Sequence, residues 1–205
     1  MFNYGRNLKM KALILAGGFG SRLSEETDIR PKPMVEVGGK PVLWHIMKMY
    51  SYYGINDFII LLGYKGYYIK EYFANYFLHQ SDVTIDISNN NIKIHNNTSE
   101  PWKVTLLDTG LNTMTGARVK KARAFVKNET FMLTYGDGLG DINIGETIKF
   151  HKQHGKLMTM TSAKPDSRFG LLNIDSNNRI LEFKEKPQDK DSRVNAGYFI
   201  CQPEV

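Results

Sequence analysis

The stretch that decides the fold is MKALILAGGFGSRLSEETDIRPKP, residues 10–33. It opens with an apolar run at residues 12–16, continues through a glycine-rich turn at 17–20 and closes with Lys32 between two prolines. An apolar run that leads into glycines is typical of a buried parallel strand ending in a loop. Glycines let backbone N–H groups approach an anion closely, and the cations Arg22 and Lys32 suit a ligand with several phosphates. The stretch therefore predicts a nucleoside triphosphate site.

The glycine turn by itself does not define one type of phosphate site. No Gly-Lys-Ser or Gly-Lys-Thr follows at the spacing of a P-loop. Arg22 and Leu23 stand near the position that a dinucleotide fingerprint reserves for its third glycine. An ordinary tight turn after a strand also fits the glycines taken alone, so the assignment depends on the rest of the chain.

Length and composition indicate one domain with one sizeable core. The chain has 205 residues and contains no internal repeat, low-complexity segment or linker. We expect a polar leader at residues 1–9 and a single domain at 10–205. Cys201 is the only cysteine, which excludes an internal disulfide, and no signal peptide or membrane segment is recognisable. We therefore expect a cytoplasmic protein.

The positive charge narrows the class of partner. A net charge of +6 at pH 7 fits nucleic acid, an anionic membrane surface or phosphorylated small molecules. The cations are spread along the chain except at residues 120–123, a cluster that a solvated helix face explains equally well. No nucleic-acid recognition motif accompanies the charge. We expect phosphorylated small-molecule substrates, and neither nucleic acid nor membrane.

Apolar runs and helical patterns alternate along most of the chain, which indicates an α/β fold with a largely parallel sheet. In such folds ligands bind beyond the carboxyl ends of the strands, where the turns at 17–20 and 136–138 both stand. The expected strands are 12–16, 58–62, 104–107, 131–134, 157–162 and 196–201, the expected helices are 42–53, 68–77, 115–124 and 144–154, and the expected hairpins are 83–94 and 170–183.

The Gly136-Asp137-Gly138 turn carries an isolated carboxylate. Mg²⁺ takes few protein carboxylates when substrate phosphates complete its coordination, so Asp137 is our candidate metal ligand. A turn aspartate with no metal role is the alternative, and Asp141, further into the loop, is the competing carboxylate. His151 and His154 can share one helix face, but no third ligand accompanies them and we expect no metal site there.

Together these motifs resemble those of the nucleotidyl transferases that make nucleotide sugars. The 10–33 stretch matches the pattern LAGGxGTRL…PKP of that family, with Ser21 in place of the threonine. The resemblance implies the nucleotide-diphospho-sugar transferase fold, a Rossmann-like α/β/α sandwich with a mostly parallel sheet. Further stretches, covering nearly the whole chain after residue 9, are similar to the members that use CTP and glucose 1-phosphate: 24–27, 40–47, 63–66, 71–77, 104–110, 114–118, 135–137, 168–170, 185–187 and 195–197.

The resemblance also implies roles for individual residues. Arg22 and Lys32 would act on the reacting phosphates, Arg118 would contact the nucleotide, and Asp137 would bind Mg²⁺. The implied nucleotide-binding set is Leu15, Ala16, Gly17, Gly18, Gly20, Ser21, Arg22, Arg118, Gly136 and Asp137, and the implied sugar-phosphate-binding set is Glu185, Lys186 and Asn195.

The implied reaction transfers a cytidylyl group from CTP to glucose 1-phosphate and gives CDP-glucose and pyrophosphate, a step of nucleotide-sugar and polysaccharide synthesis. The family has a later Asp-Thr element that helps to hold the metal, and no counterpart precedes Val205, so the expected domain lacks the family's C-terminal part. Three interpretations stay open: an active cytidylyltransferase or a part of one, the same chemistry with UTP or dTTP, and a non-catalytic nucleotide-sugar-binding protein. The family also implies a homo-oligomer, to which the aromatic segment 67–77 and the Asn-rich hairpin can contribute contacts.

Overall fold

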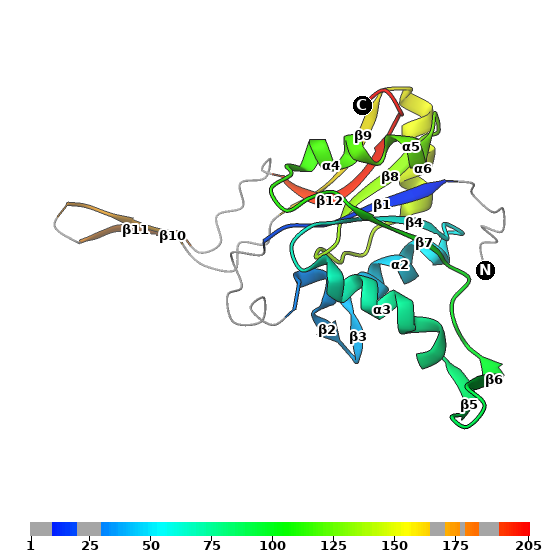
Figure 1. Ribbon diagram of the computed structural model, residues 1–205. Coiled ribbons are helices and arrows are strands. Elements are labelled where there is room, and N and C mark those ends of the chain that lie inside the picture. Colours follow the sequence, from blue (N-terminus) through cyan, green and yellow to red (C-terminus); the bar gives the residue numbers. More distant parts are fainter. Residues whose placement is uncertain (1–9, 20–29, 165–170, 177–178, 185–192) are drawn as a thin grey trace.

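The computed structural model describes residues 10–19, 30–164, 171–176, 179–184 and 193–205 (Figure 1). A six-stranded sheet lies at the centre of the described chain, in the order β7–β4–β1–β8–β12–β9. The first strand thus occupies the middle of the sheet, which places the turn after it among the ends of its neighbours. The strands are β1 (Lys11–Ala16), β4 (Asp57–Leu62), β7 (Lys103–Asp108), β8 (Phe131–Tyr135), β9 (Met158–Ala163) and β12 (Val194–Cys201).

Most of this sheet is parallel, as predicted. β1 pairs in parallel with β4 and β8, and β4 pairs in parallel with β7. β12 runs antiparallel to both β8 and β9. The carboxyl ends of β1, β4, β7 and β8 therefore meet at one edge of the sheet, which is the edge where ligands bind in folds of this kind.

Helices cover both faces of the sheet, which confirms the α/β/α arrangement (Figure 1). Side chains of β1 alternate between the two faces: Ile14 belongs to the core cluster under α2, α3 and α6, and Leu13 to the cluster under α4 and α5. Both are fully buried, so an alanine at either position would cost about 2–5 kcal/mol of stability. The helices are α2 (Val42–Tyr52), α3 (Gly66–His79), α4 (Thr115–Lys121), α5 (Arg123–Val126) and α6 (Ile144–His154).

Local signals set the limits of α6, which match the expected 144–154. The side chain of Asn143 accepts a hydrogen bond from the backbone N–H of Glu146 and caps the first turn. Gly155 follows the last residue at φ +61°, a left-handed conformation that glycine adopts without a Cβ penalty.

The helix expected at 115–124 is wrong in one respect, because it is broken at Ala122. The backbone there has φ −81° and ψ −2°, which separates α4 from the short α5. Ala122 and Val126, four positions apart, are both buried in the second core cluster. The other elements of the sheet and its helices lie within two residues of the predicted limits at each end.

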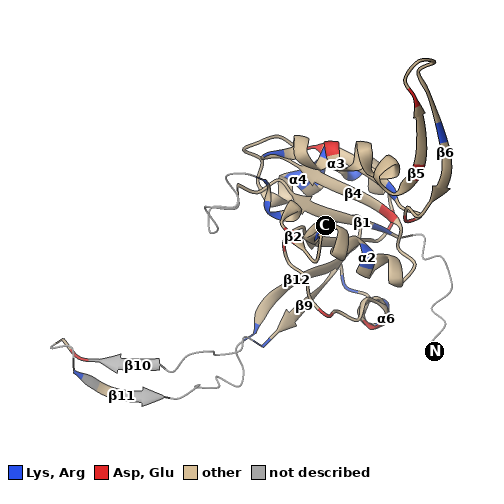
Figure 2. Cartoon of the chain, turned by 90° about the horizontal axis from the view of Figure 1, so that it is seen from below, with Lys and Arg blue, Asp and Glu red and all other residues tan. Residues whose placement is uncertain are grey.

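The expected hairpins are present as separate two-stranded sheets. β5 (Ser81–Asp86) pairs antiparallel with β6 (Asn91–Asn97), and β10 (Leu171–Ile174) pairs antiparallel with β11 (Ile180–Lys184). A third, shorter pair joins β2 (Glu36–Val37) to β3 (Lys40–Pro41) before α2, after the 3₁₀ turn η1 (Lys32–Met34). Figures 1 and 2 both show β5 and β6 extending away from the main sheet near the end of α3.

Candidate active site

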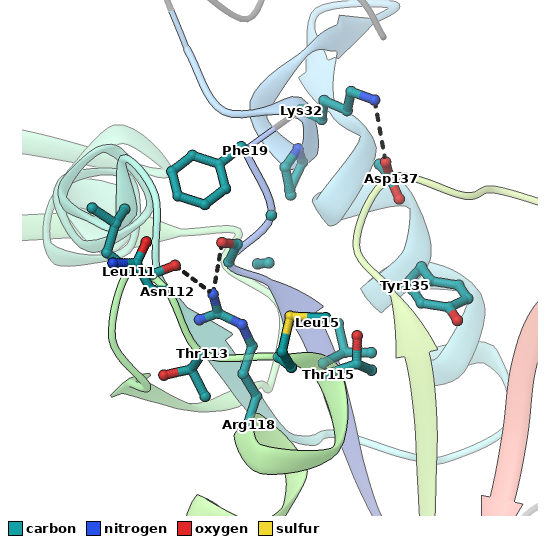
Figure 3. A pocket seen from close by; sticks show the side chains of 15 residues that line it. Leu15, Phe19, Lys32, Leu111, Asn112, Thr113, Thr115, Arg118, Tyr135 and Asp137 are labelled. Carbon is teal, nitrogen blue, oxygen red and sulfur yellow. Dashed lines mark hydrogen bonds and ion pairs between the residues drawn. The ribbon is translucent and has the colours of Figure 1, made fainter. Parts of the chain in front are cut away.

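A cavity of about 560 Å³ opens at the carboxyl ends of β1 and β8. Its position beyond the parallel strand ends is the one predicted for the ligand site. Phe19, Tyr135 and the loop after β7 form its rim, and Figure 3 shows the labelled side chains around it. The described lining residues are Leu15, Ala16, Gly17, Gly18, Phe19, Lys32, Pro33, Leu111, Asn112, Thr113, Met114, Thr115, Arg118, Tyr135 and Asp137.

Seven of the residues implied by the resemblance line this cavity: Leu15, Ala16, Gly17, Gly18, Lys32, Arg118 and Asp137. The implied residues Gly20, Ser21, Arg22, Glu185 and Lys186 lie outside the described residues. Asn195 is exposed at the beginning of β12, and its side chain accepts a hydrogen bond from the N–H of Gly197. Because β12 runs antiparallel to β8, this end of β12 lies at the same edge of the sheet as Asp137.

Lys32 and Asp137 face each other on one side of the cavity (Figure 3). The Lys32 Nζ lies 4.0 Å from a carboxylate oxygen of Asp137, and the two side chains are 20% and 47% exposed. A loose, half-exposed ion pair of this kind contributes little to stability. Both groups are therefore available to a ligand at little cost to the fold.

The turn that holds Lys32 is fixed by its two prolines. The backbone N–H of Met34 donates to the carbonyl of Pro31, which closes η1, and Pro33 is buried. Pro33 also packs toward Gly136, since a Cβ on Gly136 would lie 3.2 Å from Pro33 Cγ. The PKP element thus places Lys32 beside the Asp137 turn through direct packing.

The Asp137 turn is held on both sides. The N–H of Gly136 donates to the carbonyl of Leu15 at 2.9 Å, which ties the turn to the end of β1. A Cβ at Gly136 would lie 2.9 Å from that same oxygen, so the close approach requires glycine. On the other side the hydroxyl of Tyr198, which is buried, donates to the carbonyl of Gly138 at 2.8 Å. These contacts preorganise the carboxylate of Asp137.

The residues at the cavity fit a magnesium ion that completes its coordination on substrate phosphates. Asp137 offers one half-exposed carboxylate, and Mg²⁺ is commonly held by one or two carboxylates plus phosphate oxygens and water. The described residues contain no cluster of three or more His, Cys, Asp or Glu side chains, so an all-protein metal cage is not formed by them. Asp141 is exposed and does not line the cavity.

Arg118 lies in the wall of the cavity with its guanidinium committed to the protein. It is 5% exposed, and Nη2 donates to the carbonyls of Gly17 and Leu111, each at 3.0 Å (Figure 3). Nη1 donates to the carbonyl of Leu62, to Thr109 Oγ1 and to the carbonyl of Gly110. Burial lowers the pKa of Arg118, and the charge of Asp108 acts in the opposite direction. An arginine remains protonated in proteins, so the cavity wall carries a positive charge.

Sequence reasoning missed one wall of the cavity. Residues 111–115 form the loop between β7 and α4, and Phe19 and Tyr135 complete the rim. The position of the 111–115 loop follows from β7, which is a fourth parallel strand whose carboxyl end meets the same edge of the sheet. The sequence did contain a signal for this loop: the Asp108-Thr109-Gly110 segment ends the strand expected at 104–107.

The two histidines of α6 have a structural arrangement. His151 Nδ1 and His154 Nε2 lie 2.8 and 2.6 Å from Thr159 Oγ1. The N–H of Lys156 donates to His154 Nδ1, which places the proton of a neutral His154 on Nε2. Burial, and secondly His154, lower the pKa of His151. This cluster ties α6 to β9.

Comparisons with known proteins identify the relatives of this chain. The nucleotidyl transferase family model matches residues 11–205. The chain belongs to this nucleotidyl transferase family. It is 57% identical over 197 residues to the glucose-1-phosphate cytidylyltransferase of Salmonella typhi, which covers 96% of this chain and 76% of the relative. It is 45% identical over 196 residues to a Bacillus subtilis protein named "Probable glucose-1-phosphate cytidylyltransferase", with the same two coverages.

A solved structure shares the fold of this nucleotidyl transferase. The crystal structure of HddC from Yersinia pseudotuberculosis superposes with a TM-score of 0.64 at 24% sequence identity, covering 95% of this chain and 77% of that one. At this identity the likeness concerns the fold, which is the Rossmann-like sandwich with a mostly parallel sheet that the sequence predicted. None of the helices in the described part of the chain has the length and apolar composition needed to cross a membrane.

Proposed function

We propose that this nucleotidyl transferase transfers a cytidylyl group from CTP to glucose 1-phosphate and releases CDP-glucose and pyrophosphate. The observation that carries the proposal is the 57% identity with a glucose-1-phosphate cytidylyltransferase over 96% of the chain. The cavity supports it, because a glycine turn, a lysine and a single carboxylate meet there at the strand ends. This set of groups suits phosphoryl chemistry and includes no covalent nucleophile paired with a base.

The chemistry places its largest demand on charge stabilisation. A phosphate oxygen of glucose 1-phosphate attacks the α-phosphorus of CTP, a new P–O bond forms, and the bond to the pyrophosphate oxygen breaks in line. No general base is needed, because the attacking phosphate is already an anion. Negative charge grows on the α-phosphoryl oxygens and on the leaving pyrophosphate. We assign Lys32, which lines the cavity, to these oxygens, together with Arg22, which lies outside the described residues.

The other roles that we assign are those implied by the resemblance to the family. Gly17 and Gly18, with Gly20 and Ser21 in the undescribed part of the turn, hold the base and the triphosphate through backbone N–H groups. Asp137 would hold Mg²⁺, which when bound supplies positive charge at the phosphate oxygens. The sugar phosphate would be bound by Glu185, Lys186 and Asn195.

The test is pyrophosphate release from the purified chain with Mg²⁺ and glucose 1-phosphate, comparing CTP, UTP, dTTP and GTP. We expect release with CTP well above the other three nucleotides. Release with UTP or dTTP in preference to CTP would support the same transfer reaction with a different nucleotide as the substrate. If none of the four nucleotides gives pyrophosphate release, and calorimetry shows that the protein binds CTP, the result would support a non-catalytic binding protein instead.

We further propose that the chain self-associates in a reducing, cytoplasmic compartment. Four isoleucines of the 81–97 hairpin are exposed, between 44% and 89%, and an isolated two-stranded hairpin is marginally stable without a covering partner. Cys201 is free and buried, which suits a reducing compartment. Light scattering on the purified protein should give a molar mass larger than that of a single chain. The mass of a monomer at every protein concentration would contradict self-association. The four residues are Ile85, Ile87, Ile92 and Ile94.

A further inference from the structure

Arg118 joins three segments that come from distant parts of the sequence. Its guanidinium lies between the turn after β1, the end of β4 and the turn after β7, represented by Gly17, Leu62 and the 109–111 segment. These contacts reach up to 101 positions along the chain. Both turns contribute to the lining of the candidate active site, since Gly17 and Leu111 both line the cavity. One side chain therefore ties two adjoining parts of the cavity wall together.

The hydrogen-bonding capacity of the two terminal nitrogens of this guanidinium is used by the protein. Its two terminal nitrogens carry four N–H groups and face five protein acceptors, four of which are backbone carbonyls. A nucleotide could accept from them only after one of these bonds is given up. No described carboxylate lies within ion-pair distance of Arg118, so its charge is balanced by carbonyl dipoles and still acts on an anion in the cavity.

Two glycines make room for this arrangement. A Cβ on Gly17 would lie 2.3 Å from Arg118 Nη1, and a Cβ on Gly63 would lie 2.5 Å from the same atom. The guanidinium plane thus rests directly on backbone at both places. The N–H of Tyr64 donates to the carbonyl of Gly17, so the Gly63 turn is tied to the same point.

We infer that Arg118 is a positioning residue that holds the glycine turn against the 109–111 turn and so fixes the relative position of these two parts of the nucleotide cavity's wall. The inference rests on the proposed function for its catalytic consequence and on the contacts alone for its structural one. A lysine has the charge but not the planar fork that reaches Gly17 and Leu111 together, so it cannot replace Arg118.

The structural test is hydrogen exchange on the ligand-free protein. We expect Arg118→Lys to raise amide exchange at least tenfold in peptides that cover residues 13–19 and 109–115, and to leave α6 unchanged. Lys121→Ala is the matched control, because it removes one positive charge from the same helix and one bond to Thr109 without touching Gly17. The control should leave residues 13–19 at the wild-type rate. Wild-type exchange at both turns in Arg118→Lys would overturn the inference and return Arg118 to the role of a nucleotide contact.

The catalytic test separates positioning from general loss of structure. We expect Arg118→Lys to lower kcat and raise KM for CTP together, with kcat/KM falling about 10²-fold, because a misplacement of about 1 Å has effects of this size. Arg118→Ala leaves a space that opens on the cavity, so added methylguanidinium should recover at least tenfold in kcat/KM and lower the exchange at residues 13–19. No recovery of either quantity would overturn the inference. If the wild-type chain releases no pyrophosphate, the proposed function fails while the exchange experiment still decides the role of Arg118.

Discussion

Gly17→Ala tests the close packing of the glycine turn against the cavity wall. The new Cβ would lie 2.3 Å from Arg118 Nη1 and 2.5 Å from its Cζ. Restoring an ordinary contact of 3.4 Å requires the two to separate by about 1.1 Å. Such a movement stretches the 3.0 Å bond from Arg118 to the Gly17 carbonyl beyond hydrogen-bonding distance. Loss of one bond to a charged donor together with overpacking costs about 1–3 kcal/mol.

The assay is urea unfolding of Gly17→Ala beside Gly18→Ala. A Cβ at Gly18 meets nothing within 4 Å, so that variant should unfold within about 0.5 kcal/mol of wild type. Gly17→Ala should also lower kcat/KM for CTP by about 10²-fold, because the turn moves relative to the rest of the site. Equal free energies of unfolding for the two variants would refute the packing that we describe.

Three further predictions concern other parts of the molecule. Lys32→Ala should lower kcat by about 10²-fold or more in pyrophosphate release, since it removes a preorganised charge; near-normal turnover would remove Lys32 from its role. Tyr198→Phe deletes the hydroxyl that holds Gly138 and keeps the ring in the core, so urea unfolding should show a loss of about 0.5–1.5 kcal/mol, and an unchanged value would show that the bond contributes nothing. Because burial lowers the pKa of His151, the folded protein binds fewer protons than the unfolded chain, and stability should fall as the pH drops below about 6.5. His151→Gln should flatten this dependence in melting experiments while the exposed His79→Gln leaves it, and identical curves for the two variants would contradict the assignment.

The fold was largely predictable because its signals are local. The apolar run of β1 and the glycines after it mark a buried strand end, and the cap at Asn143 with Gly155 sets the limits of α6. The break at Ala122 was not predictable, because neither proline nor glycine stands at this position to mark it.

The candidate site was predictable where its residues follow strands directly. Asp137 stands one position after the Gly136 contact to Leu15, and the strand alternation was enough to bring both to one edge. The contacts formed by Arg118 were not predictable, since an arginine on a helix gives no indication of which carbonyls it will meet. The loop at 111–115 was missed for a related reason: its residues carry no charge, and only the order of strands in the sheet brings it to the cavity.

The most direct test of the proposed function is detection of the product itself. The purified chain would be incubated with Mg²⁺, CTP and ¹³C-labelled glucose 1-phosphate, and the mixture analysed by chromatography with mass spectrometry. The account predicts labelled CDP-glucose in amounts equal to the pyrophosphate released, and its formation at a rate at least 10²-fold lower with Lys32→Ala. Absence of labelled CDP-glucose from the wild-type reaction, with the protein folded and CTP bound, would contradict it.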